Sequence, residues 1–252
     1  MERRVKYFLV QRVASLVYFF SVVLTPSLEQ GLEGGLILVS MVIKIGMAPF
    51  HAWFLRVFST ASWRIIFLLS TVQKTIPLLV ISQNAKYLRD MWVVLLLTLV
   101  IVVIWGAKHI IMRKILALSS LRNVRWILVS MLQRALLWGQ YICIYGGLLA
   151  PVLWALSYRA PQTRTQALRG GLSLFKTGFL LIAVFSIGGL PPLLGFLNKL
   201  LIIKRALEST TVVLLIIVVL SSLCLLYFYT GLFFILLRAP AEPVIHAQAL
   251  YP

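Results

Sequence analysis

Long apolar runs joined by short polar connections are the feature that most constrains this chain. A transmembrane helix needs about 20 predominantly apolar residues. The chain offers about eight such runs, and no connection between them is long enough to hold a soluble domain. The approximate runs are 5–25, 35–56, 64–82, 91–107, 114–133, 135–158, 172–203 and 211–237. The sequence therefore predicts an all-α, polytopic transmembrane helix bundle that forms a single membrane domain over residues 1–252.

Composition excludes most other classes of protein. Hydrophobic residues make up 61% of the chain and charged residues 12%, against about 45–50% and about 25% in soluble domains. The 24 Lys and Arg outnumber the 6 Asp and Glu, and the net charge is +18. Because these cations lie between or inside apolar runs rather than on a soluble face, nucleic-acid binding is not expected. Cys143 and Cys224 lie in apolar runs without metal-ligand spacing, so we expect small packing residues and no metal site.

Two apolar runs are interrupted by residues that a continuous helix does not accommodate. Residues 44–51 read Lys-Ile-Gly-Met-Ala-Pro-Phe-His, and residues 186–199 contain Gly-Gly-Leu-Pro-Pro. Proline removes a backbone donor and clashes with the preceding turn. In lipid, the freed backbone groups are tolerated only where protein or water satisfies them, and paired broken helices indicate a transport path. The expected breaks involve Gly46, Pro49, Gly188, Gly189, Pro191 and Pro192; a kink that serves only packing is the alternative.

Three lysines lie well inside the runs, namely Lys44, Lys74 and Lys199. An ionisable group inside a span costs about 2.5–3.5 kcal/mol on insertion scales and is a functional candidate by default. Burial disfavours a charged ammonium, so a lysine in such surroundings can exchange a proton near neutral pH. The three lysines predict a proton relay, with snorkelling to the interface as the alternative. His51 is either a second proton shuttle or a histidine that bonds a helix-end carbonyl.

The acids and the remaining buried cations qualify this prediction. Arg122 and Arg125 lie three residues apart in one run, either as counter-charges near a water path or as a pair that stabilises the bundle. All six acids lie at span ends or in connections. These acids are Glu2, Glu29, Glu33, Asp90, Glu208 and Glu242. A self-contained proton channel would usually hold a buried carboxylate. Either a neighbouring subunit supplies one, or this chain does not pump alone.

The broken segments resemble a known family. Residues 44–53 and 186–199 are similar to the two broken helices of NADH dehydrogenase subunit 2, a family of antiporter-like core membrane subunits of respiratory complex I. Residues 6–11, 73–74, 113–120 and 226–229 match further segments in the family's order. The resemblance implies two inverted five-helix repeats, each with one broken helix. It also implies that Lys44, Lys74 and Lys199 correspond to the family's buried lysines and His51 to its histidine.

The chain also departs from the family. Leu55-Arg56 stands where the family usually has Pro-Glu, and Arg122-Asn123 where it has a histidine. We expect this chain to lack the family's N-terminal helices and its last helix. A separate chain that supplies the missing N-terminal helices would reconcile the differences, as would a reduced subunit with a structural role.

The resemblance implies a membrane-arm subunit that contributes to proton translocation driven by quinone reduction elsewhere. NADH, FMN, iron-sulfur clusters and ubiquinone are then expected in other subunits, with no cofactor in this chain. The alternative is a structural subunit of the same fold without a proton path. An independent cation/proton antiporter is disfavoured because this chain has no intramembrane carboxylate to bind a cation. The expected partners are other membrane-arm subunits.

The distribution of positive charge predicts the orientation. Placing both termini inside puts most Lys and Arg in the inside connections, as the positive-inside rule requires. With the family resemblance, inside is the matrix side of the mitochondrial inner membrane. Arg159, Arg164 and Arg169 in the longest inside connection are candidates for contact with a partner or with anionic lipid such as cardiolipin. The alternative is that they only carry the orientation signal.

Overall fold

The computed structural model describes residues 2–24, 30–84, 94–98, 100–101, 112–133, 137–157, 174–191, 193–207, 215–216, 218–220 and 222–223. These residues form helices and the turns that join them, and this part of the chain contains no strand. The helices are α1 (Glu2–Val23), α2 (Gln30–Ile45), α3 (Ala52–Phe58), α4 (Trp63–Ser70), α5 (Val72–Gln83), α7 (Met112–Gln133), α8 (Leu137–Ser157), α10 (Leu174–Gly188) and α11 (Leu194–Leu207). The prediction of an all-α class is confirmed.

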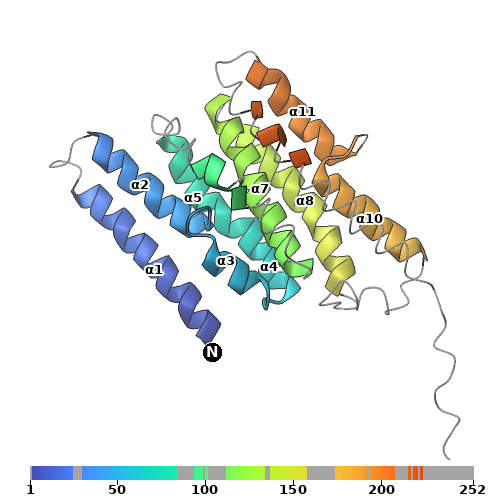
Figure 1. Ribbon diagram of the computed structural model, residues 1–252, viewed down its shortest axis with the longest axis horizontal. Coiled ribbons are helices and arrows are strands. Elements are labelled where there is room, and N and C mark those ends of the chain that lie inside the picture. Colours follow the sequence, from blue (N-terminus) through green and yellow to red (C-terminus); the bar gives the residue numbers. More distant parts are fainter. Residues whose placement is uncertain are drawn as a thin grey trace, which may run out of the picture.

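Helix α7 lies in the middle of the bundle (Figure 1). Helices α1 and α2 pack on each other at one side, and α10 and α11 lie at the other. Helices α3, α8 and α11 all pack against α7. In the apolar stretch of α7, 94% of the residues are buried inside the protein, whereas in that of α1 the share is 11%. Nearly all side chains of α7 must therefore find their partners within the protein, whereas α1 presents most of its surface outward.

Four helical stretches are long and apolar enough to cross a membrane. They are Val5–Val23, Trp63–Gln83, Arg113–Leu132 and Leu137–Ser157. Helix α2 contributes a shorter apolar stretch, Gly34–Ile45. The predicted runs 91–107 and 211–237 lie largely outside the described residues, as do Arg159, Arg164, Arg169, Pro192 and Cys224.

Both predicted breaks are present, and they share one backbone geometry. Helix α2 ends just before Gly46 and α10 ends just before Gly189, and these glycines have φ of 77° and 81°. The N–H of each glycine and the N–H of the next residue donate to one carbonyl, that of Val42 in the first break and that of Phe185 in the second. This is the glycine cap that commonly ends a helix, because glycine adopts positive φ without a steric penalty.

The predicted run 64–82 corresponds to the stretch Trp63–Gln83, which Thr71 (φ −117°, ψ −78°) divides into α4 and α5. The Thr71 hydroxyl donates to the Phe67 carbonyl at 2.7 Å, and such back-bonding bends helices. The structure corrects one expectation, because Cys143 is exposed on α8 rather than buried as a packing residue. Cys143 lies on a helix long enough to span the membrane, and such a helix can expose apolar residues to lipid. Its apolar neighbours in the sequence therefore do not imply that Cys143 is buried inside the protein.

Candidate functional site

Helix α7 carries an unusual set of buried polar side chains. Ser119, Ser120, Arg122, Asn123, Arg125 and Ser130 are all at most 2% exposed. Burying a polar group is costly unless it is hydrogen-bonded. Ser119 and Ser130 donate to carbonyls in the preceding turn of α7 itself. Ser120 and Arg122 instead bond residues of other helices, so α7 links several elements through polar contacts.

Lys74 reaches α7 from α5. Its side chain is 3% exposed, and its Nζ donates to the Ser120 hydroxyl at 2.5 Å and to the Ser120 carbonyl at 3.2 Å. The same Nζ lies 4.9 Å from the centroid of the Phe54 ring on α3. A ring face attracts a cation, and more strongly where water is excluded. Lys74 is thus held by neutral oxygens and an aromatic face.

Lys199 reaches α7 from α11, on the side of the second break. Its side chain is 5% exposed. Its Nζ donates to the Gly188 carbonyl and lies 5.8 Å from the centroid of the Trp126 ring on α7. A Cβ on Gly189 would collide with the Lys199 side chain. The second break therefore needs glycine at this position both for its backbone angle and for the space that Lys199 occupies.

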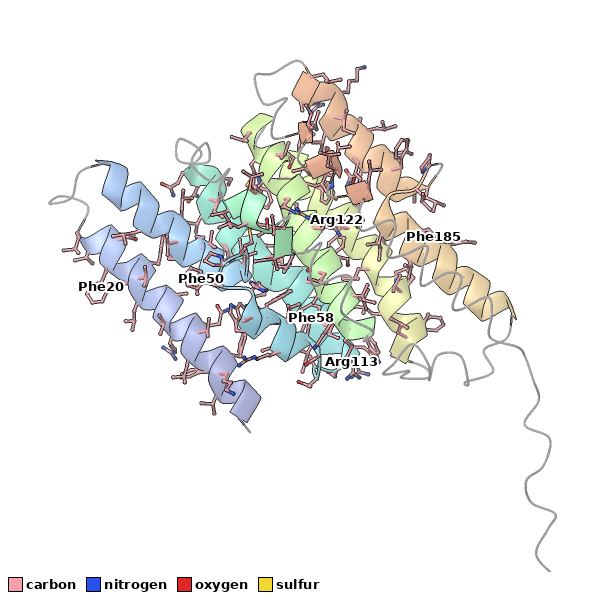
Figure 2. The ribbon with its side chains drawn as sticks, in the orientation of Figure 1. Phe20, Phe50, Phe58, Arg113, Arg122 and Phe185 are labelled. Carbon is pink, nitrogen blue, oxygen red and sulfur yellow. The ribbon has the colours of Figure 1, made fainter. Side chains whose placement is uncertain are left out.

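Arg122 completes the second break. It is fully buried, and its Nη2 donates to the Ile187 carbonyl at 2.8 Å. Figure 2 labels Arg122 in the upper part of the bundle. The last carbonyls of a helix have no partner within that helix and carry the negative end of its dipole. At the end of α10, Arg122 and Lys199 supply both the donors and the opposite charge that these carbonyls favour.

Lys44 and His51 lie at the first break instead. Lys44 is half-buried on α2, and its Nζ lies 5.6 Å from the centroid of the Tyr18 ring on α1. Its carbonyl accepts a hydrogen bond from Gln11 Nε2 at 3.3 Å. His51 lies just before α3, with its Nδ1 3.2 Å from the Pro49 carbonyl. The structure therefore brings Lys74 and Lys199 to one central helix and leaves Lys44 at the α1–α2 contact.

The two buried lysines contact α7 at different levels along its axis. Lys74 contacts α7 at Ser120 and Lys199 contacts it at Trp126. Six residues of α-helix rise about 9 Å. Arg122 and Asn123 lie between these two contact positions, and Asn123 Oδ1 accepts a hydrogen bond from the Tyr141 hydroxyl at 3.2 Å. Polar groups thus follow α7 from one lysine toward the other.

The charges in this region are all positive. The sequences of α5, α7, α10 and α11 contain no Asp or Glu. Among the described residues, no group of three or more His, Cys, Asp or Glu side chains could hold a metal ion. This arrangement can move a proton or hold an anion, and it offers no cation-binding carboxylate.

Sequence and structure comparisons place the chain in a family. The profile of the "NADH:quinone oxidoreductase/Mrp antiporter, TM" family matches residues 8–224. The chain belongs to this family. Proteins named NADH-ubiquinone oxidoreductase chain 2 are 31% identical over 92% of the chain in Anopheles gambiae, 29% over 82% in Locusta migratoria and 29% over 92% in Mus musculus. The aligned regions span 70%, 63% and 71% of the length of those relatives.

Two solved membrane-complex chains share the fold. A chain of respiratory complex I from Thermus thermophilus with bound aureothin aligns with a TM-score of 0.81 and 22% identity, over 96% of this chain and 61% of that one. A chain of the Mrp complex from Dietzia sp. aligns with a TM-score of 0.75 and 18% identity, over 92% and 50%. The helix bundle described above is therefore the antiporter-like membrane fold.

Sequence reasoning found the lysines of this antiporter-family chain but not their partners. In the sequence, Ser120 is noticeable only as part of the segment 113–120 that matches the family. The carbonyls of Ile187 and Gly188 carry no side-chain signal at all. Phe54 looked like an ordinary apolar residue. The serine pair 119–120 inside an apolar run was the one available signal, since buried hydroxyls in a span need a partner.

Proposed function

We propose that this chain is a membrane-arm subunit of an NADH:ubiquinone oxidoreductase of the complex I type and contributes to proton translocation. The observation that carries the proposal is that two buried lysines from different helices both contact α7, at Ser120 and at Trp126, two positions about 9 Å apart along the helix axis. Lysine releases and regains its proton when buried, whereas arginine stays charged. Lys74 and Lys199 are then the proton-exchanging groups. Lys44, with His51 as a further shuttle, would extend the relay toward the first break.

The same proposal covers the setting of the subunit. We place it in the mitochondrial inner membrane with both termini on the matrix side, in contact with other membrane-arm subunits. NADH, FMN, iron-sulfur clusters and ubiquinone would be bound by other chains of the complex, with no redox step in this one. A carboxylate from a neighbouring chain would supply the acidic partner that α5, α7, α10 and α11 lack.

Lys74→Met and Lys199→Met in the assembled complex test the relay. We expect each variant to retain NADH oxidation while the number of protons moved per NADH falls. Lys204→Met is the matched control, because Lys204 lies on the same helix as Lys199 and is exposed. Proton stoichiometry equal to that of the control in both variants would refute the relay.

A structural subunit without a proton path is the second candidate. It is favoured by the Arg122 contact with the Ile187 carbonyl, which ties α7 to the broken helix with a side chain that cannot release its proton. In that case, Lys74→Met and Lys199→Met would reduce the amount of assembled complex and leave proton stoichiometry unchanged in what assembles.

A further inference from the structure

A cavity of about 620 Å³ lies between α1 and α3, away from the buried lysines. Helix α3 packs beside the N-terminal part of α1 in Figure 1. The residues that line the cavity include Lys6, Leu9, Val10, Trp53, Arg56 and Val57. The cavity is the size of a small-molecule site, typically about 300–1,000 Å³.

The polar part of the cavity favours an anion. Lys6 and Arg56 are both exposed, and no Asp or Glu is among the residues that line the cavity. A third basic residue lies next to the cavity lining. Arg113 Nη1 donates at 3.4 Å to the carbonyl of Ser59, and Ser59 also lines the cavity. Lysine binds phosphate as a point charge, and arginine binds it with two parallel hydrogen bonds.

The apolar part of the cavity continues along α1. Leu9, Val13, Leu16 and Phe20 recur at helical spacing on one face of α1 and are 53–55% exposed. From Leu9 to Phe20 this stripe is about 17 Å long, close to the roughly 15 Å of one leaflet of a hydrocarbon core. Figure 2 labels Phe20 toward the far end of α1.

Two aromatic rings mark the level of the cavity in the membrane. The Tyr7 and Trp53 rings lie 5.8 Å apart, centroid to centroid. Tyrosine and tryptophan are enriched where lipid headgroups meet the hydrocarbon core. Lys6, Arg56 and the start of the apolar stripe at Leu9 all line the cavity beside these rings.

We propose that this cavity binds one anionic phospholipid. Its phosphate lies with Lys6 and Arg56, and one acyl chain follows the α1 stripe from Leu9 to Phe20. The combination of two cations with an apolar stripe one leaflet long fits a phospholipid better than a free anion or a protein helix. The cavity lining includes none of the lysines of the proposed relay.

Lipid retention by the full chain tests the site. The wild-type chain is reconstituted with phosphatidylcholine and phosphatidylglycerol, stripped with mild detergent and examined by native mass spectrometry. We expect one retained phosphatidylglycerol, and a roughly thirtyfold weaker affinity for it in the K6Q/R56Q double variant, since each basic residue near an anionic headgroup is worth about 1 kcal/mol. K204Q/R205Q removes the same charge from α11 and should retain the lipid. Val57→Trp, which fills the cavity and keeps both cations, should lose it.

Four results would overturn the proposal. One is retention that is equal in K6Q/R56Q and K204Q/R205Q. Another is equal retention of phosphatidylcholine, which would mean that the site does not select an anionic lipid. The third is stabilisation of the chain by inorganic phosphate alone to the same extent as by phosphatidylglycerol vesicles, which would make the site a free-anion site. Displacement of the lipid by a copurifying subunit would assign the α1 face to protein contact instead.

Discussion

At the scale of single residues, the two buried lysines are held by neutral groups. Lys74 donates to both oxygens of Ser120, and Lys199 donates to the Gly188 carbonyl, with aromatic rings nearby. Neutral acceptors favour the ammonium less strongly than a carboxylate would, since hydrogen bonds between two ionised groups are the stronger class. A lysine in such a site can change its protonation state without breaking an ion pair.

The Lys74–Ser120 contact predicts energetic coupling between the two side chains. A hydrogen bond to a charged group contributes about 1.5–3 kcal/mol, so Ser120→Ala should destabilise the full chain in detergent. Once Lys74 is methionine, most of that cost should disappear. Unfolding of the two single variants and the double variant measures the coupling. Ser130→Ala is the control, because the Ser130 hydroxyl donates to the Ile127 carbonyl of its own helix, and this variant should be additive with Lys74→Met. Additivity at Ser120 would contradict the contact.

Gly189 gives a second prediction at this scale. Gly189→Ala places an L side chain at φ 81°, which costs about 1–2 kcal/mol, and the new methyl group meets the Lys199 side chain. We expect a lower unfolding temperature for the full chain in detergent. Gly178→Ala on the same helix has open space around the new Cβ and should be neutral or slightly stabilising. Equal stability of the two variants would disprove the requirement for glycine at position 189.

At the scale of helices, the two breaks have the same backbone cap but different partners for their free carbonyls. In the first break, the Ile43 carbonyl accepts from Trp53 Nε1 at 3.2 Å and the Lys44 carbonyl accepts from Gln11 Nε2. In the second break, Arg122 and Lys199 are the donors. Neutral donors satisfy the first helix end, whereas two cations satisfy the second. The dipole of α10 is therefore the negative partner for buried charge in this part of the bundle.

Arg122→Met tests that role. Without the guanidinium, the end of α10 loses a charged donor, and the cap amides of Gly189 and Leu190 should exchange hydrogen roughly tenfold faster or more. Hydrogen-exchange mass spectrometry of peptides over each break measures the change. The amides of Gly46 and Met47, which make the equivalent bonds to Val42, serve as the internal control. Equal acceleration at both breaks would indicate global loosening instead of a local clamp.

At the scale of the whole molecule, burial is distributed very unevenly. Helices α1 and α7 both have membrane-spanning length, yet nearly all of the α7 window is inside the protein and little of the α1 window is. Helix α1 packs on α2 and α3 at the edge of the bundle (Figure 1). Local stability follows local burial. The bundle therefore has a buried centre at α7 and a largely exposed helix, α1, at its edge.

This gradient predicts the order in which the bundle opens. With increasing denaturing detergent, amides of α1 should lose protection before those of α7, because α7 cannot open without disturbing α3, α8 and α11. Hydrogen exchange at successive detergent concentrations gives the order, and α8 (one third of its window buried) should fall between them. Simultaneous loss of protection in α1 and α7 would mean that the bundle unfolds as one unit.

Much of this architecture follows from the sequence alone. Long apolar runs require helices in a membrane, and glycine and proline close together inside such a run interrupt the helix, so the all-α class and both breaks were predictable. Isolated lysines in apolar runs can also be recognised in the sequence as functional candidates, because their burial is costly. The break at Thr71 was not predictable, since threonine is compatible with a continuous span and only its local hydroxyl bond marks the bend.

The sequence by itself determined that this is a membrane bundle with two broken helices and a few buried cations, since hydropathy, proline geometry and charge burial are local properties. Only the tertiary structure decided which cations share a helix and what holds them. Lys74 and Lys199 reach α7 from α5 and α11, and Arg122 reaches from α7 to the end of α10, although these helices are far apart along the chain. Their partners are a serine hydroxyl, aromatic faces and backbone carbonyls. Backbone carbonyls are the same at every position, so folding alone selects Ile187 and Gly188 as acceptors.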